Sequence, residues 1–202
     1  GFKAPSLYQT YSVYGSPNLN PERSFGGEAG LETTRGDWQS ELTWFTNRFR
    51  DLIDFNLNTS KYFNQSRAQT NGVEWSLGYT PGLFRAENAL TFLRAYDPDT
   101  GLALPRRPRW TNSLTLGASR EKKWGANLIL RYVGEREDTH PALLTRQTMP
   151  PFLTLGADYF HALSPSLRFT VRGVNLLDRR YQETSGFGVP GLSAYAGLEA
   201  DL

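Results

Sequence analysis

The sequence contains no cysteine, a single methionine and only two histidines in 202 residues. Without cysteine, neither a disulfide framework nor a thiolate metal site is available to the fold. His140 and His161 lie far apart and lack a cluster of companion ligands. No Gly-rich phosphate cradle is present either. The sequence therefore predicts neither a metal nor another cofactor.

Long apolar runs are also missing. A transmembrane helix needs about 18 or more consecutive apolar residues, and no such run occurs. The negative mean hydropathy is still compatible with a membrane β-barrel, because every second residue of its strands faces a polar lumen. The 22 basic and 20 acidic residues are spread evenly, without a basic stripe. We therefore expect no nucleic-acid partner.

A catalytic constellation cannot be recognised. Four serines lack a His and Asp arrangement that would activate them as nucleophiles: Ser6, Ser164, Ser166 and Ser185. An acidic group in the segment GEREDTH resembles a carboxylate pair, but its charged surroundings predict that it is solvated: Glu135, Glu137 and Asp138. The sequence predicts no catalytic residue and no enzymatic activity.

A period of two dominates the chain. Apolar side chains alternate with polar ones from Phe25 to Leu31, from Val73 to Tyr79, from Trp124 to Tyr132 and from Leu167 to Val171. Such alternation is typical of β-strands with one apolar face. Each clear run has about ten residues, which is the length of a tilted strand that crosses a bilayer. We expect about nine full strands and the tail of another before Pro5, with no amphipathic helix.

Short and long connections alternate between these runs. The short turns lie at 34–37, 80–83, 120–123 and 163–165, and the longer links at 55–61, 97–108, 135–150 and 177–191. This regular asymmetry is typical of an up-and-down membrane barrel and is not required by a Greek-key β-sandwich. The polar faces also carry charges of both signs that can pair across a lumen. A soluble β-sandwich binding module remains the alternative.

Aromatic residues cluster near the ends of the runs: Trp38, Trp44, Tyr79, Trp110, Trp124, Tyr132, Tyr159 and Tyr195. Their apolar rings and polar tips suit the headgroup layer of a membrane, so we interpret them as an aromatic girdle. The alternative is the general preference of aromatic residues for strands.

Two motifs make the prediction specific. The first motif comprises F-K-A-P-S-L-Y at residues 2–8 and S-P-N-L-N-P-E-R-S at 16–24. The second motif is N-L-L-D-R-R-Y at 175–181. In this order and at this distance, they resemble the motifs of TonB-dependent outer-membrane receptors. The resemblance implies the C-terminal part of a roughly 22-stranded, plugged transmembrane β-barrel. Residues 1–202 would form this part, without the plug and the earlier strands.

The opening segment is expected to be an extracellular loop. Three prolines are expected to keep residues 2–22 out of the β-ladder: Pro5, Pro17 and Pro21. Tyr8, Tyr11 and Tyr14 offer rigid amphipathic rings to a ligand. A stiff loop whose tyrosines make no ligand contact is the alternative.

The middle of the chain narrows the resemblance. D-L-I-D-F at 51–55, K-Y-F-N at 61–64 and N-G-V-E at 71–74 are similar to a hairpin of receptors that import cobalamin (vitamin B12). By this resemblance, Arg106 and Phe187 would contact the ligand, through hydrogen bonds to amide or phosphate oxygens and through a ring against an apolar edge. The alternative for Arg106 is a solvated or ion-paired loop charge, and the alternative for Phe187 is packing within its loop. The alternative ligand is a ferric siderophore or haem.

The resemblance also implies a location and partners. The location is the bacterial outer membrane. The partners are its lipid and lipopolysaccharide, the TonB complex through the missing plug, and the barrel-assembly machinery. The sequence departs from the family at two places. The chain ends on Leu202, where the family usually has an aromatic residue, and Leu192 follows Gly191, where the family commonly has Arg.

Overall fold

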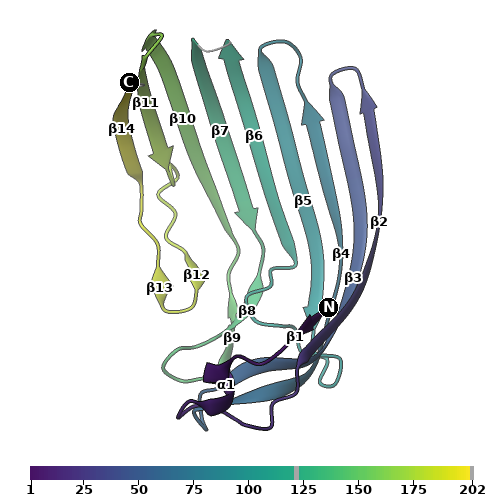
Figure 1. Cartoon of the computed structure of the whole chain (residues 1–202). Helices are drawn as coiled ribbons and strands as arrows, with labels where there is room; N and C mark the ends of the chain where they lie inside the picture. Colours follow the sequence, from purple (N-terminus) through teal and green to yellow (C-terminus); the bar gives the residue numbers. More distant parts are fainter. Residues whose placement is uncertain (121–122, 201–202) are drawn as a thin grey trace.

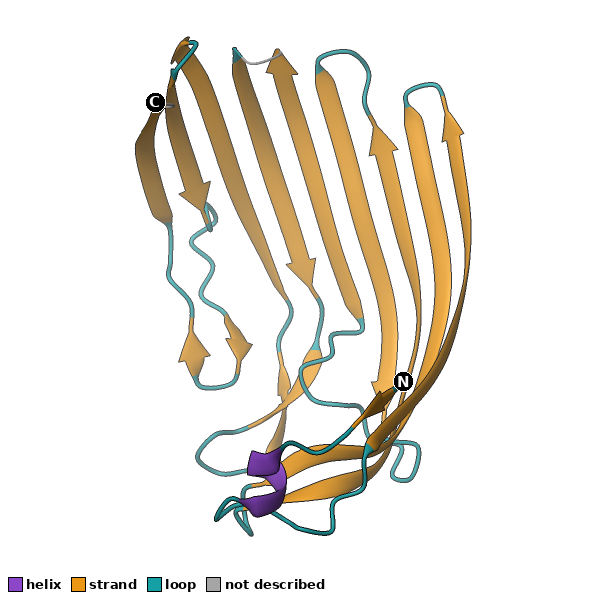
Figure 2. Cartoon of the chain, in the orientation of Figure 1, coloured by secondary structure: helices purple, strands orange, loops and turns teal. Residues whose placement is uncertain are grey.

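The computed structural model describes residues 1–120 and 123–200. They form a curved antiparallel sheet whose order is β1-β2-β3-β4-β5-β6-β7-β10-β11-β14 (Figures 1 and 2). The strands are β1 (Phe2–Lys3), β2 (Glu22–Arg35), β3 (Trp38–Asn56), β4 (Lys61–Tyr79), β5 (Phe84–Tyr96), β6 (Trp110–Arg120), β7 (Trp124–Val133), β10 (Phe152–Ser164), β11 (Leu167–Val174) and β14 (Ser193–Ala200). Nine full strands and a short tail confirm the predicted count and the barrel-like meander. The middle of the turn at 120–123 and the end at Leu202 lie outside the described residues.

Two small hairpins and one helix lie at the end of the sheet with the long links (Figure 1). The hairpins are β8 (Arg136–Thr139) with β9 (Arg146–Met149), and β12 (Gln182–Thr184) with β13 (Phe187–Gly188). The helix α1 (Leu7–Tyr11) begins with a capping box between Ser6 and Gln9. The sequence predicts no amphipathic helix; α1 has five residues and no buried face, and such a single capped turn is too short to show a helical period. No helix in the described part is long and apolar enough to cross a membrane.

The strand pairing confirms the predicted alternation. Directly opposite residues share a face, so the row Trp44, Val73, Phe92 and Trp110 crosses four strands on the apolar face. Glu28 lies opposite Phe45 on the other face, which carries most of the charged strand residues. Leu42, Leu116 and Leu128 are each almost half exposed. Among the described residues no second sheet covers this apolar face, so the β-sandwich alternative is wrong.

Seven of the eight predicted girdle aromatics lie on the apolar face; Tyr195, opposite Arg172, lies on the charged face, where the girdle prediction is wrong. Trp38 stacks on Tyr79 at 4.1 Å near the short turns, and Phe92 meets Trp110 at 4.7 Å toward the long links. Six residues separate Trp38 from the Trp44 row, or about 20 Å along a strand. This spacing is close to the roughly 25 Å apolar band of outer-membrane barrels.

Two expectations about the ladder need correction. Phe2 and Lys3 pair with Arg23 and Glu22, although the prolines were expected to keep residues 2–22 unpaired. Pro5 restricts only its own position and the residue before it, so the chain ahead of Ala4 is free to pair. Strands β3 and β4 have 19 residues each instead of about ten, and the link between them shrinks to 57–60. Asp51, with φ of +57°, lies within this long hairpin.

The two faces predict opposite responses to charge. Leu128→Arg places a cation on the apolar face near the middle of the band and should destabilise the complete receptor by about 3 kcal/mol. Ile129→Arg places the same cation on the charged face, one residue along, and should cost far less. Urea unfolding of the two variants in lipid vesicles measures the difference. Equal losses of stability would contradict the assignment of the faces.

Candidate functional site

The opening loop is held onto the long β3–β4 hairpin by side chains of that hairpin. Lys61 Nζ donates to the carbonyl oxygens of Val13 at 3.0 Å and Gly15 at 3.4 Å. Asn64 accepts from the amide of Asn20 at 2.8 Å and donates to its carbonyl at 2.9 Å. These bonds reach backbone atoms only. The K-Y-F-N segment therefore positions a loop, whatever ligand the loop serves.

The predicted tyrosines lie in this anchored loop. Tyr8 meets Tyr62 edge to face at 6.2 Å, and Tyr14 meets Phe55 in the same way at 6.0 Å. Tyr11 is 75% exposed. The structure thus gives two of the three tyrosines a packing role and leaves the third ring accessible; ligand contact by any of them stays a prediction.

The N-L-L-D segment closes the base of the last long link. Asn175 and Asp178 have φ of +51° and +46°, a conformation that Asn and Asp tolerate better than most residues. Asn175 Nδ2 donates to the carbonyl of Arg179 at 3.0 Å, and Asp178 Oδ1 accepts from the amide of Leu192 at 2.9 Å. A Cβ on Gly191 would lie 2.6 Å from this Oδ1, so a side chain at 191 would push the Asp178 carboxylate out of its present place. The segment orients the β12–β13 hairpin.

A polar cluster then joins three of the long links. Asp138 on β8 is 1% exposed and accepts from the amides of Ser185 and Thr139, both at 2.8 Å. Arg106 Nε, from the 97–108 link, lies 3.1 Å from Asp138 Oδ1. Arg136 is 5% exposed and donates to the carbonyl of Glu183 at 3.0 Å and to that of Gln182. We call Arg106, Arg136, Asp138 and Ser185 the loop clasp.

The clasp shifts the titration of its own members. Burial by itself would raise the pKa of Asp138, but the amides of Ser185 and Thr139 and the Arg106 guanidinium together hold the pKa below its ordinary value. Burial lowers the pKa of Arg136, while Asp138 and Glu183 oppose that shift. The carboxylate is therefore charged, and an arginine stays cationic in proteins. The prediction that Asp138 is solvated was wrong.

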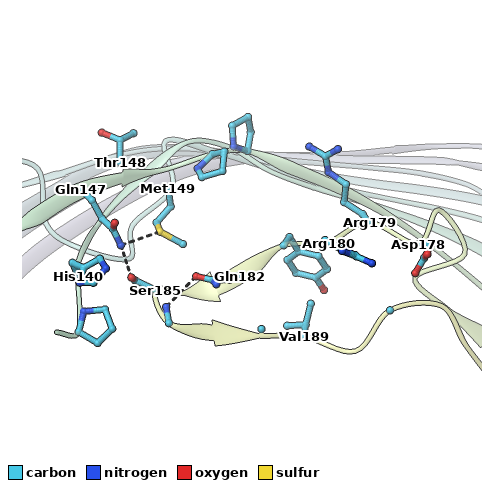
Figure 3. Close-up of a pocket in the computed structure, with 17 residues that line it drawn as sticks. His140, Gln147, Thr148, Met149, Asp178, Arg179, Arg180, Gln182, Ser185 and Val189 are labelled. Carbon is cyan, nitrogen blue, oxygen red and sulfur yellow. Dashed lines mark hydrogen bonds between the residues drawn. The ribbon is translucent and has the colours of Figure 1, made fainter. Parts of the chain in front are cut away.

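A cavity of about 970 Å³ opens beside the clasp, between the β8–β9 and β12–β13 hairpins. Figure 3 shows His140, Gln147, Met149 and Ser185 at one end and Asp178 with Arg179 at the other. Arg180 and Tyr181 also line it, and Tyr181 stacks on Phe152 at 4.0 Å. Arg179 and Arg180 are exposed. Neither forms an ion pair within the described part of the chain.

Of the predicted ligand residues, Arg106 and Phe187 lie next to residues of this site without lining the cavity. Arg106 contributes through the clasp and has φ of +57°, while its side chain is 57% exposed. Phe187 is 69% exposed and lies between two lining glycines. Sequence reasoning missed Arg179 and Arg180, although their place within N-L-L-D-R-R-Y was a usable signal. No sequence signal marks Asp138 as buried, because its partners come from other loops.

Comparison with a family model decides the relationship. The model described as "TonB dependent receptor-like, beta-barrel" matches residues 1–176. The chain belongs to this family. The receptor chain is also similar to the siderophore receptor PirA from Acinetobacter baumannii, with 22% identity and a TM-score of 0.82 over 98% of this chain. It spans 37% of the PirA chain, so it corresponds to little more than a third of that receptor's length.

Two further structures support the same fold. A mutant of the ferric enterobactin receptor PfeA from Pseudomonas aeruginosa has 19% identity and a TM-score of 0.82, with 98% of this chain and 36% of that chain covered. The copper transporter OprC has 15% identity and a TM-score of 0.80, with 98% and 35% covered. At these identities the likeness establishes the fold of the receptor chain and leaves its ligand open.

Removing the buried charge should open the loop clasp. Asp138→Asn keeps the shape of the side chain but weakens three charge-assisted contacts, each worth about 1.5–3 kcal/mol. Hydrogen exchange of the amides at 182–188 in the complete receptor should accelerate by at least about tenfold. Asp158→Asn, the same change at a strand position that accepts from Asn127 at 2.7 Å, serves as the control. Unchanged exchange in Asp138→Asn would contradict the clasp.

The lowered pKa of Asp138 gives the clasp a defined pH dependence. The stabilisation that the Asp138 carboxylate gives the clasp is fully present above its pKa in the unfolded chain, which is about 3.9. This stabilisation is lost as the pH falls through the still lower pKa of Asp138 in the folded protein. Pepsin cleavage within 182–188 should therefore rise only below about pH 4. The Asp138→Asn variant should lack this transition. The same pH dependence of this cleavage in the unmodified receptor and in the Asp138→Asn variant would refute the assignment.

Proposed function

We propose that this chain is the C-terminal part of an outer-membrane receptor that imports an anionic metal chelate, most simply a ferric siderophore. The chain would supply part of the barrel wall and of the ligand vestibule, without chemistry on the ligand. A plug and earlier strands on the same polypeptide would complete the barrel. Transport would depend on the TonB complex, and insertion on the barrel-assembly machinery.

The paired arginines of the loop cavity carry the proposal. Arg179 and Arg180 are exposed, adjacent and without an ion pair in the described residues, so they present two cationic groups to the cavity. A ferric catecholate is a large anion with aromatic rings. Guanidinium groups suit its oxygens, and Tyr181 offers a ring beside them. The volume of about 970 Å³ lies within the range of ligand pockets, which is roughly 300–1,000 Å³.

Cobalamin has weaker support than a siderophore. The resemblance to cobalamin receptors depended on the K-Y-F-N segment, whose Lys61 and Asn64 bind loop backbone. That role is equally useful to receptors for other ligands. The similar structures named above are a siderophore receptor, a ferric enterobactin receptor and a copper transporter. We therefore favour the siderophore, with cobalamin and haem as competing ligands in the test.

The arginine pair should control affinity. In the complete receptor, the double variant Arg179→Ala/Arg180→Ala should weaken binding of ferric enterobactin by at least about tenfold, since each charge-assisted hydrogen bond contributes about 1.5–3 kcal/mol. Quenching of intrinsic fluorescence in a titration measures the dissociation constant. The double variant Arg168→Ala/Arg172→Ala removes the same charge from the charged face of β11, and it should bind ferric enterobactin as the unmodified receptor does.

Competition separates the ligand classes. Saturable binding of ferric enterobactin that cobalamin and haem do not displace is the expected result. Saturable binding of cobalamin, undisturbed by ferric enterobactin, would overturn the siderophore proposal and leave the receptor architecture intact.

A further inference from the structure

An apolar hollow of about 660 Å³ lies on the apolar face of the sheet. Its floor consists of small residues from five strands: Ala118, Ala126, Ala157, Gly173 and Ala194. Leu116, Leu128 and Tyr159 rise around it. The strand pairing places all of these on one face, in two neighbouring rows of the register.

The hollow stays open in a complete barrel. A barrel closes through the edges of its sheet, and a plug fills its lumen, so neither covers the outer face of the central strands. The hollow is centred on β6, β7, β10 and β11, and the outermost strand β14 contributes only Ala194. Lipid is therefore the medium against this face. The four alanines of the floor let an apolar chain approach the backbone closely, whereas the Leu176 side chain already lies against Gly173.

The end of the hollow toward the short turns is cationic and aromatic. Arg120, Trp124 and His161 form the next row on the same face beyond Ala126 and Tyr159, about 7 Å from that row and about 13 Å from the Leu128 row. The Tyr159 hydroxyl lies 3.2 Å from His161 Nδ1, and Lys123 follows in the turn. In the described residues, the apolar faces of β6, β7, β10 and β11 carry no carboxylate. This row therefore suits an anionic headgroup.

We propose that the hollow binds one acyl chain of an anionic phospholipid, with the phosphate beside Arg120, His161 and Lys123. The apolar floor accounts for the chain, and the cationic row accounts for the charge of the headgroup. A protein partner fits less well, since a stable interface takes about 800 Å² from each side and the hollow covers only two register rows. The lipid belongs to the leaflet on the side of the short turns, away from the ligand cavity.

Native mass spectrometry of the complete receptor tests the proposal, with palmitoyl-oleoyl phosphatidylglycerol as the probe and phosphatidylcholine of the same chains as the competitor. Ala157→Phe fills the floor and should reduce retained phosphatidylglycerol by about tenfold, because several methylene groups lose their burial. Leu155→Phe adds a ring on the same strand and face, outside the hollow, and should retain the lipid. The double variant Arg120→Gln/His161→Gln should reduce the preference for phosphatidylglycerol by about fivefold.

Two results would overturn the proposal. One is equal retention of phosphatidylglycerol by the Ala157→Phe and Leu155→Phe variants, which would show that the hollow does not hold the lipid. The other is equal retention of phosphatidylcholine and phosphatidylglycerol by the unmodified receptor, which would show ordinary contact with the surrounding bilayer. Folding of each variant is verified by its heat-modifiable migration on gels before the comparison.

Discussion

Backbone pairing along the sheet is the constraint on which the rest of the molecule depends. In lipid no water can satisfy a free N–H or C=O group, so a strand can cross only when its neighbours pair with it throughout. The pairing runs from Arg23–Arg50 in β2 and β3 to Leu167–Ala200 in β11 and β14. A slip of one residue would exchange the two faces, exposing Glu28 or Arg131 to hydrocarbon. The alternation of side chains is thus inseparable from the register.

The long links face a different physical problem at the end of the sheet. They are exposed to water and carry many polar groups, so apolar burial alone cannot order them. Side chains bind backbone atoms instead, in three places. Lys61 and Asn64 act on the opening loop, Asn175 and Asp178 at the base of the last long link, and Arg136 and Asp138 in the loop clasp. Each residue ties one link to another or closes a link at its base. The last two pairs act at the walls of the cavity between the two small hairpins, where Asp138 binds the lining residue Ser185 and Asp178 lines the cavity itself.

The motif residues act mainly on the backbone of the loops, which explains why the motifs indicated the family correctly and the ligand less well. The motif residues that the structure explains are mostly those that hold backbone, and such contacts serve any receptor of this shape. Arg179 takes part in the turn of its motif only through its backbone, which bonds to Asn175, and the side chains of Arg179 and Arg180 are left to line the cavity. Ligand preference is therefore expected in the positions that a structural motif leaves free. The proposed lipid contact likewise depends on small residues that lie between the larger apolar residues of the strands.

The sequence alone determined the strand count, the two faces and the positions of the short turns, because each depends on alternation and turn chemistry within a few neighbouring residues. It also placed most of the predicted girdle aromatics on the apolar face, with Tyr195 as the exception. Only the tertiary structure decided the burial of Asp138, the helix after Ser6, the pairing of Phe2 and Lys3, and both cavities. Asp138 receives hydrogen bonds from Ser185, 47 residues away, and from Arg106, 32 residues away. Contacts between loops so distant in sequence leave no periodic signal, since they arise only when the sheet brings the ends of its strands together.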